Sequence, residues 1–151
     1  FGMTGWRLGW LVAPNAHVSA IDKLAQNLFL AAPTMAQHAA LKAFAEDSIG
    51  ILEARRREFQ QRRDFLLPAL REIGFDIPVI PDGAFYLYAN CSRFSTDSYS
   101  FTSRLLEEAG VAITPGIDFG INKPETHVRF AYTTSMENLQ EGVQRLRAFL
   151  A

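Results

Sequence analysis

Two arginines have the surroundings expected of anion-binding side chains. Arg7 lies in the glycine-rich segment 1–9, and glycine lets a backbone approach a ligand closely. Arg129 lies in the apolar segment 127–132, where strand alternation places it beside the small Ala131 and away from the larger apolar side chains. A guanidinium group offers paired donors that suit a carboxylate or a phosphate. Each arginine could also be an ordinary solvated side chain, and the two segments alone leave both interpretations open.

The elements that would hold these arginines follow from hydrophobic periodicity and from capping residues. In the first half we predict a buried strand over 6–13 and helices over 17–30, over 34–45 with a capping box at Thr34–Gln37, and from Asp47 or Ser48 to Ile73. Pro68 should kink or break the last helix near Phe65, and Gly74 should end it. Along this helix Glu58 can pair with Arg62, so its arginine run is better read as a solvated face than as a nucleic-acid surface.

The second half alternates shorter elements. We predict strands over 84–90, 111–114 and 127–132, a helix over 98–109, and a last helix that starts at a capping box over 134–137. This order predicts a small α+β domain, in which helices cover one face of a mainly antiparallel sheet.

Composition excludes several classes of function. The chain has 151 residues and a formal net charge of −1, so no general electrostatic attraction to nucleic acid is expected. No apolar run is long enough to span a membrane. The single cysteine, Cys91, cannot form an internal disulfide and suits a reducing, cytoplasmic setting. The three histidines show no metal-ligand spacing, so no metal is expected.

Four segments, in order along nearly the whole chain, resemble class I and II aminotransferases. They are residues 1–9, 81–87, 110–120 and 128–132. These fold-type-I enzymes use pyridoxal 5'-phosphate and transfer an amino group between an amino acid and a 2-oxo acid. The family pattern places the Schiff-base lysine two residues before Phe1. The resemblance therefore implies the C-terminal portion of a longer enzyme, which begins just after that lysine and is inactive by itself.

The resemblance also implies roles for particular residues. Arg7 matches the arginine that holds the cofactor phosphate, and Arg129 matches the arginine that binds the α-carboxylate of the substrate. Phe85 matches an aromatic residue near the substrate, although an ordinary core phenylalanine fits its position equally well. No catalytic residue is expected within the chain, because none of its lysines lies in the matching context.

The same resemblance divides the chain into three parts and implies a homodimeric parent protein. Residues 1–33 would belong to the large cofactor-binding domain, residues 34–74 to linking helices, and residues 75–151 to the small α+β domain. The isolated chain should then expose apolar surface around Trp6, Trp10 and the 34–45 helix. Its copies should therefore associate differently from those of the parent protein, or exchange domains.

Two other functions stay open at this point. The C-terminal part could be a stand-alone, non-enzymatic module that binds a small carboxylate or an amino acid through Arg129. The parent could also be a fold-type-I enzyme of another reaction type, because a fold does not fix a function. The amino acid used by a transaminase is not evident from the sequence.

Overall fold

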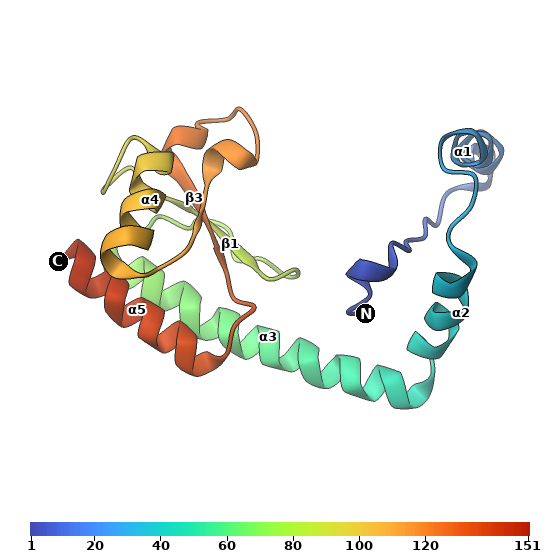
Figure 1. Ribbon diagram of the computed structural model, residues 1–151, viewed down its shortest axis with the longest axis horizontal. Helices are drawn as coiled ribbons and strands as arrows, with labels where there is room; N and C mark the ends of the chain where they lie inside the picture. The colour runs from blue at the N-terminus through green and yellow to red at the C-terminus, as the bar shows by residue number, and fades with distance from the viewer. The chain divides into compact units, whose positions relative to one another are not determined.

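A computed structural model describes every residue from Phe1 to Ala151 (Figure 1). The chain forms two compact units, Phe1–Arg55 and Arg56–Ala151, and each is described by itself. Helix α3 (Glu46–Ile73) begins in the first unit and ends in the second. The finer division at residues 33 and 74 remains a prediction.

The first unit is helical and contains no strand. It holds a 3₁₀ turn (Thr4–Trp6), helix α1 (Asn15–Leu28), helix α2 (Thr34–Ala43) and the start of α3. The predicted strand over 6–13 is therefore wrong. A strand needs a neighbour to complete its backbone hydrogen bonds, and this unit offers none.

The predicted capping box at the start of α2 is also wrong. Pro33 is the N-cap residue, and no side chain caps the helix. Thr34 is consequently the first helical residue, one position too far along to cap. The side-chain amide of Gln37 instead donates a hydrogen bond to the Ala32 carbonyl over 2.9 Å.

Little of the first unit is buried. Only Ala36 and Ala40 are buried in it, while the rings of Phe1, Trp10 and Phe44 meet in a surface cluster with centroids 5.0–5.4 Å apart. Many large apolar side chains are exposed: Trp6, Leu11, Val12, Leu28, Phe29, Leu30, Met35 and Leu41. An apolar surface of this kind is typical of a region that associates with other protein.

The second unit is built around a three-stranded antiparallel sheet of order β1-β3-β2. The strands are β1 (Tyr86–Asn90), β2 (Thr114–Pro115) and β3 (His127–Ala131). Helices α4 (Ser98–Ala109) and α5 (Met136–Leu150) join the C-terminal part of α3 in one core with the sheet (Figure 1). The predicted α+β fold is confirmed.

Strand alternation decides which face of the sheet is buried. Leu87 and Ala89 in β1, and Val128 and Phe130 in β3, point into the core with at most 4% exposure. They pack against the apolar faces of the three helices, with Leu66, Leu70, Phe101, Leu105, Leu139, Val143 and Leu146. The other face of the sheet therefore carries the residues between them, among them Arg129.

The sequence predicts a kink or a break at Pro68, and of these the break is absent, because helix α3 continues through the proline. Proline costs a hydrogen bond, but four residues around it, Leu66, Leu67, Ala69 and Leu70, are buried in the core. The burial of these side chains offsets that cost. The helix ends before Gly74, whose φ of +119° suits glycine, and the predicted Glu58–Arg62 ion pair forms on it.

Several element boundaries in the second unit differ from prediction: β1 begins at Tyr86 and not at residue 84, and β3 ends at Ala131 and not at residue 132. Ser135, not Thr134, caps α5, and its hydroxyl accepts a hydrogen bond from the Asn138 amide. Strand β2 covers only Thr114–Pro115, because the Val111 amide bonds to the Leu105 carbonyl at the end of α4. That bond keeps the start of the segment with the helix.

Cys91 should be unreactive until the second unit unfolds. The side chain is fully buried, and burial raises the pKa of its thiol to about 11. Because the thiolate is the reactive form, the folded chain should resist iodoacetamide at pH 8, and alkylation should follow unfolding in urea. Mass spectrometry measures the modified fraction. Rapid alkylation of the native chain would contradict the burial.

Candidate functional site

Arg129 lies in the central strand, on the face of the sheet that the helices leave open. In the register it is paired with Tyr88 of β1 on one side and with Thr114 of β2 on the other. Tyr86 projects from the same face of β1, two residues before Tyr88. The predicted placement of Arg129, opposite the core-facing residues of its strand, is confirmed.

The guanidinium group of Arg129 is held against two aromatic rings. Its Cζ atom lies 4.2 Å from the centre of the Tyr86 ring and 4.4 Å from that of Phe119, within the range of cation–π attraction. One terminal nitrogen, Nη2, donates a hydrogen bond to the Thr114 hydroxyl over 3.3 Å. The side chain is thus fixed by three neighbours.

No acid neutralises this arginine. Arg129 takes part in none of the ion pairs of the chain, and its buried Nε has no hydrogen-bond partner. A buried polar group without a partner is costly, and a half-buried cation without a counter-ion adds to that cost. A carboxylate or phosphate from outside the chain would supply the missing partner.

A tight corner after β2 carries Phe119 to the arginine. At Gly116 an added Cβ would collide with the Pro124 carbonyl, lie 2.6 Å from the His127 carbonyl and lie 2.9 Å from the Tyr88 hydroxyl. Only glycine allows this approach. The chain then makes a 3₁₀ turn (Gly116–Asp118), which the Phe119 amide closes by bonding to the Gly116 carbonyl over 2.9 Å.

Tyr88 belongs to the same open face. Its ring stacks on His127 at 5.1 Å and meets Phe119 edge-on at 6.2 Å. The pKa of the Tyr88 hydroxyl is raised, mainly by partial burial and to a smaller extent by the nearby Cys91 thiol. Tyr88 is therefore a neutral, aromatic wall of the site and not a second charge.

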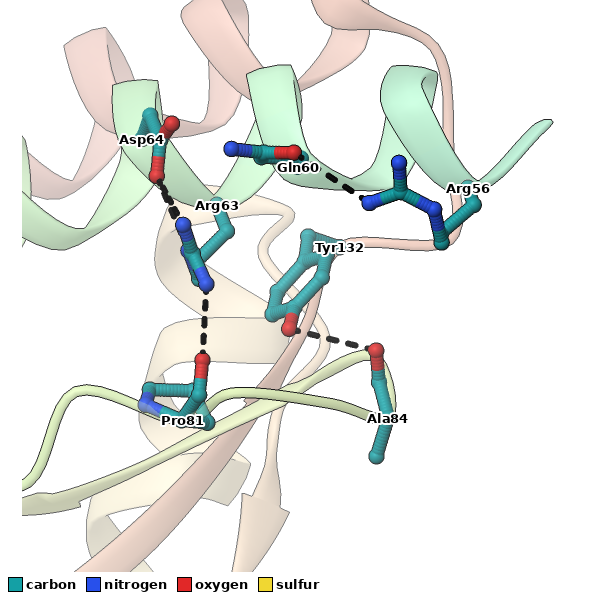
Figure 2. Close-up of polar contacts among 7 residues, drawn as sticks. All are labelled: Arg56, Gln60, Arg63, Asp64, Pro81, Ala84 and Tyr132. Atoms are coloured by element: carbon teal, nitrogen blue, oxygen red, sulfur yellow. Dashed lines mark hydrogen bonds and ion pairs between the residues drawn. The ribbon is translucent and has the colours of Figure 1, made fainter. Parts of the chain in front are cut away.

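The loop that precedes Phe85 is held in place by hydrogen bonds at its Pro81 and Ala84 carbonyls (Figure 2). Arg63 donates a hydrogen bond to the Pro81 carbonyl over 2.8 Å, and the Tyr132 hydroxyl donates one to the Ala84 carbonyl over 3.3 Å. The Phe85 ring is 36% exposed and lies 4.2 Å from the Tyr86 ring. The Tyr86 ring thus lies in contact with both Phe85 and Arg129. The predicted role of Phe85 near the substrate remains a prediction.

Arg7 lies in the first unit, at the end of the 3₁₀ turn. Its backbone is left-handed, with φ of +52°, and its guanidinium donates only a 3.4 Å hydrogen bond to the Thr4 carbonyl. The side chain is exposed and joins no ion pair. Most of its donors are therefore accessible, and its predicted role with the cofactor phosphate remains a prediction.

Sequence reasoning found Arg129 but not the side chains that hold it. Alternation within paired strands could have placed Tyr86 on the face of Arg129. The contact with Phe119 depends on the corner at Gly116, for which no periodic signal exists.

No group of three or more histidine, cysteine or acidic side chains could hold a metal ion. None of the helices has the length and apolar character needed to cross a membrane.

The fold is that of part of a fold-type-I enzyme. Residues 1–146 match the family described as Aminotransferase class I and II, and the chain belongs to this family. It is 39% identical over 150 residues to the (5-formylfuran-3-yl)methyl phosphate transaminase of Methanocaldococcus jannaschii, and 38% identical over 150 residues to the valine–pyruvate aminotransferase of Mycobacterium tuberculosis. Each alignment covers 99% of this chain but only 39% of the relative.

Solved structures agree with this assignment. An aminotransferase from Mycobacterium tuberculosis superposes with a TM-score of 0.88 at 39% identity, over 98% of this chain and 38% of that chain. A Methanococcus jannaschii protein, described as similar in its active site to kynurenine aminotransferases, gives a TM-score of 0.85 at 40% identity, over 99% of this chain and 39% of that chain.

Proposed function

We propose that this chain is the C-terminal portion of an aminotransferase that depends on pyridoxal 5'-phosphate and transfers an amino group between an amino acid and a 2-oxo acid. The observation that carries the proposal is Arg129, a half-buried guanidinium without any acidic partner, in a chain of the aminotransferase family. The names of the relatives, which include a valine–pyruvate aminotransferase, support this reaction class.

In this proposal Arg129 binds the substrate α-carboxylate. Two parallel N–H donors fix a carboxylate in one plane, and this orients the Cα–H bond of the amino acid for proton removal. The ring of Tyr86, which packs against the guanidinium, limits the access of water to the ion pair, and this strengthens the pair. Phe85, beside Tyr86, would contact the remainder of the substrate.

Arg7 would hold the cofactor phosphate. When bound, the cofactor supplies an electron sink for the carbanion formed at the substrate Cα. Arg7 and Arg129 would then fix cofactor and substrate by one anionic group each. We place the Schiff-base lysine before Phe1, so the 151-residue chain alone should be inactive.

We further infer that the parent protein is a cytoplasmic homodimer. The apolar side chains exposed on the first unit, such as Trp10 and Leu30, support association with other protein. The single buried cysteine, Cys91, fits a reducing compartment. Residues 1–33 would complete a large cofactor-binding domain, 34–74 would link the domains, and 75–151 would form the small domain.

The test is a comparison of the parent protein with the isolated chain. The parent, purified with pyridoxal 5'-phosphate, should acquire the visible absorption of a bound cofactor and should form new amino acids from a panel of amino donors and 2-oxo acids. The isolated chain should do neither. A parent without any cofactor absorption, together with tight calorimetric binding of an amino acid by the isolated chain alone, would instead favour the stand-alone binding module.

A further inference from the structure

We propose that Phe119 is a positioning residue for Arg129. With Thr114, its ring fixes the plane of the guanidinium group so that the paired N–H donors meet a carboxylate squarely. The inference rests on the proposed function, because it takes a substrate carboxylate as the ligand of Arg129. It adds a residue that touches neither the carboxylate nor the cofactor and acts through the arginine.

Phe119 has no other evident purpose in the fold. Its side chain is 44% exposed and lies outside the hydrophobic core of the second unit. Its ring meets Arg129 and, edge-on, Tyr88. A large apolar side chain that stays this exposed contributes little through burial, so its contact with the cation is its main interaction.

Thr114 and Phe119 restrain different motions of the same group. The Thr114 hydroxyl accepts from Nη2 and limits rotation of the guanidinium within its own plane. The face-on contacts of Phe119 and Tyr86 limit its tilt. Arginine side chains have many rotamers, and holding one of them before the ligand arrives lowers the entropic cost of binding.

The backbone fixes the place of Phe119 without help from its ring. The corner at Gly116 and the bond from the Phe119 amide to the Gly116 carbonyl are main-chain features. A change of side chain at Phe119 should therefore leave the loop and the fold intact. This makes the residue suited to substitution.

The experiment compares Phe119→Leu, which keeps an apolar side chain but loses the aromatic face, with Phe119→Tyr, which keeps that face. Both are made in the parent protein and assayed with its best amino-acid donor. Because Phe119→Leu leaves the guanidinium in place and only weakens its grip before binding, a bound substrate keeps its orientation. The variant should therefore raise KM roughly three- to tenfold and leave kcat within about twofold. Phe119→Tyr should restore the wild-type KM.

Ile117→Ala is the matched control. Ile117 lies in the same turn, is 49% exposed and has no ring to offer, so its variant should keep both constants. A fall in kcat at unchanged KM, or an equal loss in Ile117→Ala, would show a merely structural role and overturn the proposal. An active wild type with an unchanged KM in Phe119→Leu would also overturn it, while leaving the proposed function intact. A wild type that transfers no amino group would overturn both.

Discussion

Arg129→Lys should strongly slow amino transfer by the parent protein. Lysine keeps the positive charge but loses the planar fork with its paired donors, and with it the guanidinium contacts to the Tyr86 and Phe119 rings. Loss of the bidentate contact at a desolvated charge pair should cost about 2–4 kcal/mol, so kcat/KM should fall roughly 30- to 1,000-fold. Steady-state kinetics with an amino-acid donor measures the change.

The control for this variant is Arg104→Lys in α4. Arg104 forms an exposed ion pair with Glu108 over 3.0 Å, and such pairs contribute little. Its variant should therefore retain wild-type kcat/KM. If Arg129→Lys and Arg104→Lys are equally active, Arg129 does not bind the substrate.

Gly116→Ala should strongly destabilise the second unit. The new methyl group would press on the carbonyls of Pro124 and His127 and on the Tyr88 hydroxyl, and backbone carbonyls cannot rotate away as a side chain can. Overpacking of this kind lowers the free energy of unfolding by about 1–3 kcal/mol or more. Urea unfolding of the 151-residue chain, followed by circular dichroism, measures the loss.

Gly142→Ala should, by contrast, stabilise the second unit. Gly142 lies inside α5, and an added Cβ would meet nothing within 4 Å. Since alanine favours a helix more than glycine does, this variant should gain about 0.5–1 kcal/mol. Equal stability of the two variants would mean that the corner at Gly116 is looser than the structure describes.

Elements that local sequence specifies were predicted correctly, whereas elements that need a distant partner were not. Helix α4 was predicted from Ser98 to Ala109, with Gly110 as its end, because local periodicity and a capping glycine specify it. The residues 6–13 read as a strand from their apolar composition alone. That composition marks the segment for burial, but a strand also needs a partner, and a single sequence does not reveal one.

Within the candidate site, too, local features were predictable and long-range contacts were not. Arg129 and the direction of its side chain followed from strand alternation, which is a local rule. The sequence places Thr114 only at the end of a predicted strand, and Phe119 only within a segment that resembles the family. Their contacts with Arg129 depend on the register of β2 against β3 and on the corner at Gly116. Such long-range geometry carries no periodic signature in the sequence.

The central claim is that Arg129 serves an amino-group transfer. The most direct measurement follows the nitrogen: the parent protein is given a ¹⁵N-labelled amino acid and an unlabelled 2-oxo acid of different carbon skeleton, and the products are analysed by mass spectrometry. The account predicts ¹⁵N in the amino acid formed from the 2-oxo acid, at an initial rate that is roughly 30- to 1,000-fold lower in Arg129→Lys. Release of the label as ammonia, or transfer that Arg129→Lys leaves unchanged, would contradict it.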